Sequence, residues 1–566
     1  MLQELCTPRG ETVSGTPWDL YPRPQMRRDS YVNLNGQWVF SAEDYRGTIV
    51  VPFCPESRLS GVNRHFSEGA KLTYKRTFTL PEHFHKGRVL LHFGAADQHL
   101  RCFVNEKKVG THIGGYTAFT FDITDALCDG ENTLRCECFD DLRNPLHPYG
   151  KQTMNRGGMW YTPVSGIWQT VWLESVPRDY IQSLRIENRE DAVEVFIEPA
   201  LPGKVVIPAL GAYTLLDGKV TVPTGGLRRW SPEDPYLYDF TVETECDKIE
   251  SYFAIRTVET KIVDGIPRLC LNGRPYFFHG LLDQGYWPEG IYTPPTPESY
   301  TDDILAMKAL GFNTLRKHIK IEAEEFYYQC DKLGMVVFQD MVNNGDYRFF
   351  RDTALPTVGL QKRNDKHLHA DENSRNTFVE TMTATVAQLR NHPSILYWTV
   401  FNEGWGQFDS DRMYGTLRKL DDTRIIDTTS GWFRRKQSDV ESLHIYFNAW
   451  HRLKFQKTRP VVLSEFGGFA YPVEGHIFNP DKAFGYKTCT SLEDFQKAFD
   501  ELYRTRVLPA ISKGLCAAIY TQVSDVEDEI NGILTYDRKA NKADKTAMIR
   551  LARDLQEALS PVPEKI

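Results

Sequence analysis

The sequence predicts a protein with two N-terminal β domains followed by a C-terminal (β/α)8 TIM barrel. Two observations lead to this fold class. Short β-type runs separated by turn signals fill the chain up to about Val263, with little helical period. Beyond that point apolar runs alternate with helical stretches, which is typical of βα units and a parallel sheet. We therefore expect a jelly-roll β-sandwich over residues 1–180, an immunoglobulin-like β-sandwich over 181–262 and the barrel over 263–566.

The first predicted domain is made of short strands without helices. Alternating or β-branched runs lie at residues 38–40, 74–78, 89–93, 100–104 and 117–123. Asn35-Gly36 and Asp129-Gly130 are turn signals between such runs. Many short strands without helices imply an antiparallel sandwich or jelly roll.

The second predicted domain continues the β pattern on a smaller scale. Its strand-like runs lie at residues 192–197, 236–242 and 252–255. A segment of this length with this spacing fits a small immunoglobulin-like sandwich.

The third predicted domain contains eight strand-like runs, at residues 276–278, 314–316, 335–338, 395–401, 424–427, 443–446, 461–463 and 516–520. Helical candidates lie between them, for example at 297–310, 323–333 and 373–390. The second of these places Phe326, Cys330 and Leu333 on one face. Eight nearly continuous apolar strands that alternate with helices indicate a (β/α)8 barrel.

The composition of the chain argues against some classes of binding partner. The 566 residues include 67 Lys plus Arg and 75 Asp plus Glu, a net charge of −8, which argues against nucleic acid or an anionic membrane. No apolar stretch reaches the ~18 residues that span a bilayer, and the first residues lack the pattern of a secretory signal. The 11 scattered cysteines contain no C-x-x-C pair, which favours reduced thiols in a cytoplasmic protein.

Two glutamates follow two of the most apolar predicted strands. Glu403 ends the fourth run, after Asn402, and Glu465 ends the seventh, before Phe466-Gly467-Gly468. Chemistry in such barrels lies at the C-terminal ends of the strands, where a buried charge needs a partner or a function. Paired carboxylates suit cleavage of a glycosidic bond, one giving a proton to the leaving oxygen and the other attacking the anomeric carbon. The retaining mechanism needs them ~5–5.5 Å apart and the inverting mechanism ~6.5–9.5 Å. The alternative is that each only caps a helix or pairs with an arginine.

These residues resemble the catalytic motifs of glycoside hydrolase family 2, which includes β-galactosidases, β-glucuronidases and β-mannosidases. The resemblance covers the whole chain, because the family combines a jelly-roll sugar-binding domain, an immunoglobulin-like sandwich and a barrel in this order. Further matching segments lie at residues 32–38, 161–169, 272–275 and 391–394.

The resemblance implies roles for four residues. Glu403 would be the acid/base and Glu465 the nucleophile that forms a covalent glycosyl-enzyme. Asn402 would donate a hydrogen bond to the sugar 2-OH, and Tyr446 would hydrogen-bond the nucleophile. For Tyr446 the alternative is a core aromatic residue.

Other strand ends and loops supply candidate sugar ligands. The ones we predict to bind substrate are His279, Asp283, Trp287, Arg316, His318, Trp405, Trp432 and Gln522. Their neighbours Gln284, Lys317, Asp340, Asn343, Asn344, Tyr520 and Asp525 are weaker candidates. A tryptophan in such a loop either stacks on a pyranose or fills a packing gap, and Arg316 either tunes Glu465 or forms an internal salt bridge.

The sugar is predicted from departures from the known branches. The β-glucuronidase branch carries an Asn-x-Lys pair before the last helix, and the matching stretch, 528–538, has no lysine in that place. Acidic residues at 525 and 527–529 gather there instead, and they would repel a uronate unless paired or solvated. Phe401 stands where β-mannosidases have a second asparagine, and long β-galactosidases hold Mg²⁺ and have more domains. We expect a neutral β-hexoside, first a β-galactoside, with a β-glucuronide second and mannosides or arabinosides further alternatives.

Two other classes of function stay open. The chain could be a carbohydrate-binding relative without catalysis, or a hydrolase that uses a metal-bound water held by His279, His318 and His444. We expect no cofactor and no metal, a small-molecule glycoside or oligosaccharide as the partner, and leave homo-oligomer formation open.

Overall fold

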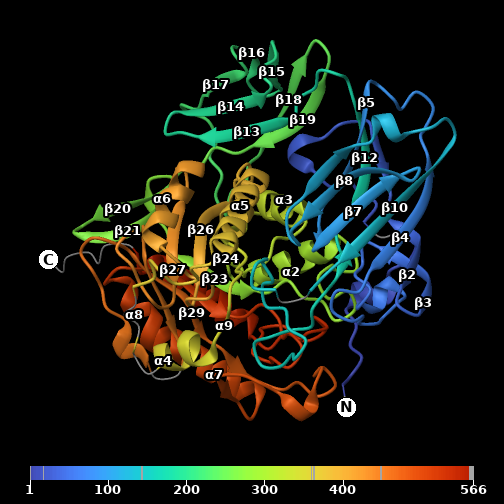
Figure 1. Cartoon of the computed structure of the whole chain (residues 1–566). Helices are drawn as coiled ribbons and strands as arrows, with labels where there is room; N and C mark the ends of the chain where they lie inside the picture. The colour runs from blue at the N-terminus through green and yellow to red at the C-terminus, as the bar shows by residue number, and fades with distance from the viewer. Residues whose placement is uncertain are drawn as a thin grey trace.

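The computed structural model describes residues 2–16, 18–141, 144–357, 360, 364–446 and 449–559. Figure 1 shows three parts in chain order: a blue β part, a green β part at the top and a barrel that runs from yellow-green to red. This is the predicted multidomain fold class, and it is confirmed.

The N-terminal part is an antiparallel β-sandwich. One sheet has the order β3-β2-β4-β10-β7-β8 and the other β1-β12-β5-β9, with β6 paired to β11. Alternation explains the packing: in β10, Leu134, Cys136 and Cys138 are buried and lie in a core with Trp38 and Tyr74. The elements are α1 (Pro8–Thr12), β1 (Tyr31–Asn33), β2 (Gly36–Ala42), β3 (Tyr45–Val51), β4 (Leu72–Thr79), β5 (Arg88–Phe93), β6 (Ala96–Asp97), β7 (His99–Val104), β8 (Lys107–Ile113), β9 (Phe119–Asp122), β10 (Glu131–Phe139), β11 (Gly166–Ile167) and β12 (Val171–Val176).

The second part is a smaller sandwich of two antiparallel sheets, ordered β13-β14-β17 and β16-β15-β18-β19. Its inward-facing residues, among them Val195, Val205 and Phe240, form a separate core. The strands are β13 (Ser183–Asn188), β14 (Ala192–Glu198), β15 (Gly203–Ile207), β16 (Gly211–Leu215), β17 (Lys219–Pro223), β18 (Tyr238–Thr244) and β19 (Lys248–Phe253).

A small antiparallel sheet joins this sandwich to the barrel. It consists of β20 (Val258–Val263), β21 (Ile266–Leu271) and β22 (Arg274–Pro275). Because β20 pairs with β21, this sheet crosses the boundary that we placed after residue 262. The division of the chain into three domains at residues 180 and 262 therefore stays a proposal, and the second boundary fits better before β20.

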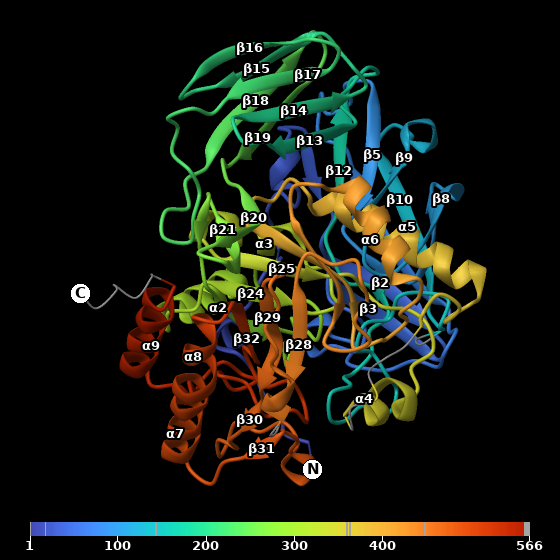
Figure 2. The same ribbon diagram turned by 90° about the vertical axis from the view of Figure 1, so that its left-hand side faces the viewer.

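The third part is a nearly closed parallel barrel. Its eight strands have the order β27-β26-β25-β24-β23-β32-β29-β28, and a contact between the hydroxyls of Ser430 and Ser442 (3.3 Å) links the two strands at the ends of that order. Every residue of β26, β29 and β32 is buried. Helices lie around the outside of the barrel (Figure 2), and the inward-facing side chains fill its interior. The strands are β23 (Phe278–Asp283), β24 (Thr314–Lys317), β25 (Val336–Asp340), β26 (Ile395–Asn402), β27 (Ile425–Ser430), β28 (Glu441–Ile445), β29 (Val461–Gly467) and β32 (Leu515–Thr521).

Helices follow most of these strands. In α3, Phe326 and Cys330 face inward as predicted, and Gly334 ends the helix in the left-handed region at φ 72°. Asp371 caps α5 by accepting a bond from the Ser374 backbone N–H. The helices are α2 (Glu298–Ala309), α3 (Glu324–Leu333), α4 (Leu355–Thr357), α5 (Glu372–Leu389), α6 (Ser410–Leu420), α7 (Leu492–Leu502), α8 (Leu508–Ile511) and α9 (Lys545–Glu557), with a short strand pair β30 (Phe469–Ala470) and β31 (Lys487–Thr488). Among the described residues, no helix is both long and apolar enough to cross a membrane.

A loop of the N-terminal part lies against the barrel where the strands end. We call residues 149–162, between β10 and β11, the rim loop. The Tyr149 N–H donates to the Asn343 carbonyl just beyond β25 (3.1 Å), and the Thr162 N–H donates to Glu527 beyond β32 (3.0 Å). The rim loop therefore spans the barrel mouth from the third strand to the eighth.

Candidate active site

Glu403 stands directly after strand β26, which ends at Asn402. Its backbone is in the left-handed region (φ 51°), which is uncommon for a residue with a side chain. The Glu403 N–H donates to the Ser430 carbonyl (2.9 Å), which fixes this turn against the neighbouring strand. The turn thus places Glu403, a residue that is only 7% exposed, at the mouth of the barrel.

Glu465 lies inside strand β29, and an irregularity in that strand sets its direction. The pairing with both neighbouring strands shifts around Ser464. The Ser464 hydroxyl contacts Ser430 (2.9 Å) and the Glu465 carboxylate contacts Arg316 (2.9 Å), so both side chains face the barrel interior. In a regular strand, successive side chains point to opposite faces, so one of the two would point outward. A β-bulge commonly changes the direction of a side chain in this way.

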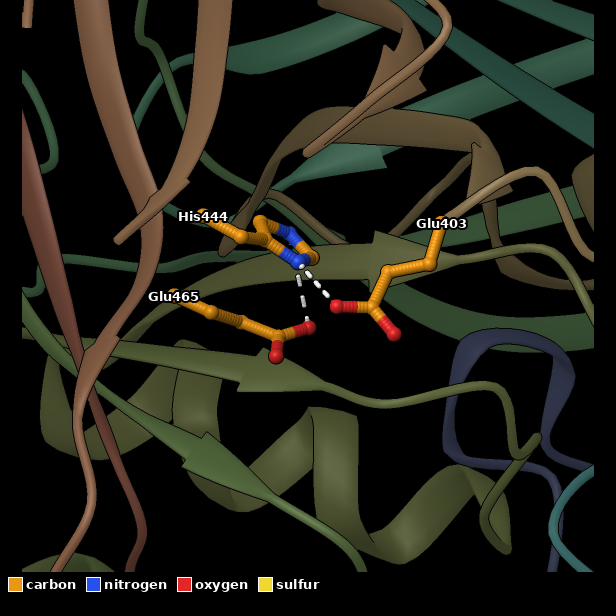
Figure 3. A group of neighbouring side chains, drawn as sticks. All are labelled: Glu403, His444 and Glu465. Carbon is orange, nitrogen blue, oxygen red and sulfur yellow. Dashed lines mark hydrogen bonds and ion pairs between the residues drawn. The ribbon is translucent and has the colours of Figure 1, made fainter. Parts of the chain in front are cut away.

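The two glutamates meet at one histidine. At least one carboxylate oxygen of Glu403 and one of Glu465 lie, with a ring nitrogen of His444, within 4.8 Å of one another. His444 Nδ1 is 2.7 Å from Glu403 Oε1, and Nε2 is 3.5 Å from Glu465 Oε1 (Figure 3). Because His444 is on β28, the site joins the fourth, sixth and seventh barrel strands.

Arg316, on β24, reaches across the barrel and connects the site residues. It donates to Glu465 Oε1 (2.9 Å), to Asp340 (3.0 Å) and to Asn402 Oδ1 (2.9 Å). A guanidinium only donates, so the oxygen of the Asn402 amide must face Arg316 and the Nδ2 group must face away. Asn402 Nδ2 has no hydrogen-bond partner within the described part of the chain, so this donor is available to a ligand.

The basic side chains around Glu465 decide its charge. Burial alone would raise the pKa of its carboxyl, but His444, Arg316, His318 and Lys151 outweigh burial and hold the pKa at about 2. Glu465 is therefore ionised at neutral pH.

Tyr446, just after β28, holds the other oxygen of Glu465. Its hydroxyl donates to Glu465 Oε2 (2.6 Å) and contacts Thr521 Oγ1 (2.9 Å), while its ring stacks on Tyr486 at 3.8 Å. Burial, and then the negative charge of Glu465, raise the pKa of Tyr446 well above its ordinary value, so the hydroxyl keeps its proton and remains a donor.

Two predicted tryptophans lie in this region with free indole N–H groups. Trp405, two residues after Glu403, stacks on Trp160 of the rim loop (5.1 Å). Trp432 lies 6.0 Å from the His444 ring. Neither indole N–H has a partner among the described residues, although both side chains are buried.

The structure corrects the prediction for His279. Strand β23 runs from Phe278 to Asp283, several residues beyond the run that we predicted, so His279 lies at the start of that strand and not at its end. Its ring packs between Phe312 and Tyr503, and Nδ1 contacts the Gly311 carbonyl (3.3 Å). It is therefore at the opposite end of the barrel wall from the glutamates.

Asp283 and Trp287 also lie away from the two glutamates. Asp283 pairs with Lys317 (2.7 Å), which follows Arg316 on β24 and so points outward toward Phe326 of α3. Trp287 is 3% exposed and packs between Arg538 and Tyr300. Both side chains therefore serve packing outside the barrel, which corrects their prediction as sugar ligands.

Gln522 and His318 lie close to the site with their polar atoms engaged. The Gln522 amide accepts from Gln284 (2.8 Å) and donates to Asn531 (2.8 Å), so each amide atom already has a protein partner. His318 Nδ1 contacts Asp340 Oδ2 (2.7 Å), and burial followed by the charge of Lys151 lowers the pKa of His318 to about 4. His318 is therefore neutral at pH 7.

The acidic residues after β32 are all paired. Lys542 binds Asp525 (2.6 Å) and Arg156 binds Asp528 (2.9 Å), and both of these carboxylates are buried. The Tyr161 hydroxyl donates to Glu529, and the Thr162 N–H donates to Glu527 (3.0 Å). Burial raises the pKa of Asp525 to about 6 and that of Glu527 to about 7, which further reduces the negative charge in this loop.

The site has one group of side chains with metal-ligand geometry among the described residues, namely Glu403, His444 and Glu465. Arg316 already donates to Glu465 Oε1 and Tyr446 to Oε2. A guanidinium at 2.9 Å repels a cation, so this group does not fit a metal ion. The histidines of the metal hypothesis do not cluster, since His279 is on the other side of the barrel wall and His318 is held by Asp340.

Three residues at the site were missed or undervalued in the sequence. His444 stands two positions before Tyr446, and strand alternation alone puts both on the interior face. Lys151 and Trp160 come from the rim loop of a different domain, and no pattern in the sequence connects them to the barrel.

Comparison with known proteins agrees with this architecture. The family model "Glycosyl hydrolases family 2, TIM barrel domain" matches residues 266–553, and "Glycosyl hydrolases family 2, sugar binding domain" matches residues 62–177. A β-galactosidase of Thermoanaerobacter pseudethanolicus is 24% identical over 80% of this chain and 62% of its own length. A β-glucuronidase of Paenibacillus borealis is 24% identical over 80% of this chain and 85% of its own length. The chain thus spans less than two-thirds of the former relative, and only 36% of the β-galactosidase of Aeromonas hydrophila.

Solved structures share the fold of the whole chain. A β-D-glucuronidase of Dictyoglomus thermophilum matches with a TM-score of 0.72 and 20% identity, covering 96% of this chain and 99% of that one. A β-galacturonidase of Eisenbergiella tayi bound to galacturonate matches with a TM-score of 0.69 and 19% identity, covering 95% and 99%. The barrel model alone spans more than half of the residues and coincides with the part that carries the two glutamates. The chain belongs to glycosyl hydrolase family 2.

Proposed function

We propose that the protein is a retaining exo-β-glycosidase that removes a terminal β-linked hexose through a covalent glycosyl-enzyme. The observation that carries this proposal is the separation of Glu403 and Glu465, whose nearest oxygens lie within 4.8 Å. Two carboxyl groups this close favour the retaining geometry (~5–5.5 Å) over the inverting one, which needs room for a water molecule between them. The rim loop over the barrel mouth supports a pocket that takes the end of a glycan.

The two carboxyl groups differ in the way that double displacement needs. Glu465 is ionised and held by Arg316 and Tyr446, so it attacks the anomeric carbon while Glu403 gives its proton to the leaving oxygen. Glu403 then takes a proton from water, which attacks the same carbon from the other side and releases Glu465. Asn402 Nδ2, turned away from Arg316, donates to the sugar 2-OH.

His444 can follow the proton of Glu403 without moving. When Glu403 is protonated, its hydroxyl donates to Nδ1, and the Nε2–H faces Glu465 and the Ser430 hydroxyl (3.1 Å). When Glu403 is ionised, the tautomer with Nδ1–H donates to it instead. One histidine thus serves both half-reactions.

The identity of the sugar is a separate question from the type of reaction. One of the relatives is named a β-galactosidase, another a β-glucuronidase and a third a β-galacturonidase. The sequence predicts a neutral galactoside because the acidic residues after β32 would repel a uronate. Those carboxylates are paired or partly neutralised, so their charge does not separate a β-galactoside from a β-uronide.

The experiment that tests the mechanism replaces each glutamate in turn. Glu465→Ala should abolish turnover, and added azide should restore release with the inverted glycosyl azide as product, because azide fills the space of the lost carboxylate. Glu403→Ala should spare substrates with good leaving groups, such as 2,4-dinitrophenyl glycosides, because they need no proton. Equal loss on good and poor leaving groups in Glu403→Ala would refute its role.

A panel of 4-nitrophenyl β-glycosides separates catalysis from mere binding. Release of nitrophenol with any sugar, with the β-anomer as first product by NMR, supports the retaining glycosidase. Sugar binding without release on every member of the panel would favour a carbohydrate-binding relative instead.

A further inference from the structure

Lys151 is a buried lysine without a carboxylate partner. Its side chain belongs to a residue that is 6% exposed, and no described carboxylate lies within ion-pair distance of it. The other buried lysines behave differently: Lys317 and Lys320 bind Glu322 (both 2.9 Å), and Lys542 binds Asp525 (2.6 Å). A buried cation without a counter-ion is costly, so the position of Lys151 suits an anionic partner, which the described residues do not supply within ion-pair distance.

Aromatic rings hold the Lys151 ammonium at the mouth of the barrel. Nζ lies 5.7 Å from the ring centre of Trp405, which follows Glu403 by two residues, and 5.6 Å from that of Tyr161. The backbone on either side is fixed, because the Tyr161 N–H donates to the Lys151 carbonyl (3.0 Å) and Tyr149 is bound to the Asn343 carbonyl. The lysine is therefore presented by a rigid loop and not by a mobile surface side chain.

The charge of Lys151 acts on the catalytic centre. It contributes to the low pKa of Glu465 and to the lowered pKa of His318. Glu465 is on strand β29 and His318 directly follows strand β24, so a cation carried by the N-terminal domain is within electrostatic range of the nucleophile.

One uncommitted side-chain amide belongs to a residue that anchors the rim loop close to Lys151 in sequence. Asn343 is 4% exposed, and neither atom of its side-chain amide has a hydrogen-bond partner in the described part of the chain. Its backbone carbonyl binds the rim loop two residues before Lys151. An ammonium suits a carboxylate, and an amide N–H can add a further hydrogen bond to it, because a carboxylate accepts several.

We propose that Lys151 binds a carboxylate on the glycone, and that the substrate class of this enzyme is therefore a β-hexuronide. The inference rests on the proposed glycosidase function and adds its substrate. It also places recognition of the carboxylate on the N-terminal sugar-binding domain, through the rim loop, while the barrel supplies the reacting groups. The paired acidic residues after β32 do not oppose a uronate, since Arg156, Lys542 and Tyr161 bind them.

The test compares matched sugars that differ only at C6. The substrates are the 4-nitrophenyl β-glycosides of glucuronate, glucose, galacturonate and galactose, and the quantity is the ratio of kcat/KM for a uronide to that for its neutral partner. We expect the wild-type ratio to exceed one for at least one pair. Lys151→Met should lower that ratio roughly 10- to 100-fold, the value of a charge-assisted hydrogen bond, mainly through KM.

Two control variants isolate the charge. Lys151→Arg keeps a cation and should retain more of the ratio than Lys151→Met. Lys108→Met removes an exposed lysine of β8 and should leave both constants at wild-type values. A second measurement needs no variant: free glucuronate or galacturonate should inhibit the wild-type enzyme at lower concentration than the corresponding hexose.

The outcomes separate the two proposals. Turnover of neutral hexosides without uronides would overturn the uronide inference and leave the glycosidase function standing. Turnover of uronides with an unchanged ratio in Lys151→Met would overturn the role of Lys151. Absence of turnover on every glycoside would instead overturn the proposed function itself.

Discussion

Replacing Arg316 by methionine should move the acid limb of the pH–rate profile to higher pH. In the wild-type protein Glu465 is 5% exposed, and burial by itself would favour the neutral form of its carboxyl group. The nearby cations, of which Arg316 is the one that contacts Glu465 at 2.9 Å, lower the pKa from 4.5 to about 2. That drop corresponds to about 3 kcal/mol in favour of the ionised form.

The sign follows from linkage. A carboxyl group whose pKa is depressed in the folded protein stabilises it above the unfolded pKa, and this contribution is lost as the pH falls from 4.5 toward 2. Methionine has a similar length and no charge, so the pKa of Glu465 rises and the nucleophile becomes protonated at a higher pH. We expect the acid limb to rise by at least about one pH unit, or about 1.4 kcal/mol.

The assay uses a 2,4-dinitrophenyl β-glycoside of the preferred sugar. Its leaving group needs no protonation, so the acid limb of kcat/KM reports the nucleophile and not Glu403. Arg316→Lys is the control, because it keeps the charge and loses the fork that also orients Asn402. It should lower the rate with a smaller movement of the acid limb. A folded Arg316→Met variant with the wild-type acid limb would show that other groups keep Glu465 ionised.

Two further predictions follow from single contacts. Tyr446→Phe removes the hydroxyl that donates to Glu465 Oε2 (2.6 Å) and should lower kcat roughly 10- to 100-fold, as measured with the same substrate; turnover near the wild-type value would mean that Arg316 alone positions the nucleophile. Lys542→Met leaves Asp525 buried without its cation and should destabilise the protein by about 3–5 kcal/mol, seen as a lower urea midpoint. The double variant with Asp525→Asn should recover part of that loss, and equal midpoints for Lys542→Met and wild type would contradict the argument.

The barrel was predictable because its signal is local. Each of the eight strands is present, since a strand buried on both faces is apolar along its whole length. The ends of the strands were harder to predict. Strand β23 continues through Leu281 and Leu282 to Asp283, and this difference alone places His279 at the far end of the barrel wall and not at the expected site. An error of a few residues in a strand boundary leaves the predicted fold unchanged, but it changes where a side chain lies.

The two glutamates were predictable for a related reason. Parallel strands bring their C-terminal ends to one rim, so Glu403 and Glu465 had to meet there however far apart they are in sequence. Trp287 was not predictable in this way. Its burial between Arg538 and Tyr300 depends on distant segments that close over the loop, and an aromatic residue in a loop has the same local pattern in either role.

The acidic residues after β32 show why the sugar was harder to predict than the reaction. Their charge is visible in the sequence, but their partners Arg156, Tyr161 and Thr162 stand 365 to 372 positions earlier, in another domain. The same rim loop carries Lys151, so one contact between domains both neutralises the anions and presents a cation. The reacting groups are set by the topology of the barrel, whereas the charge that a substrate meets is set by how the N-terminal domain packs on it. A change in the rim loop could therefore alter the choice of sugar while Glu403, His444 and Glu465 stay in place.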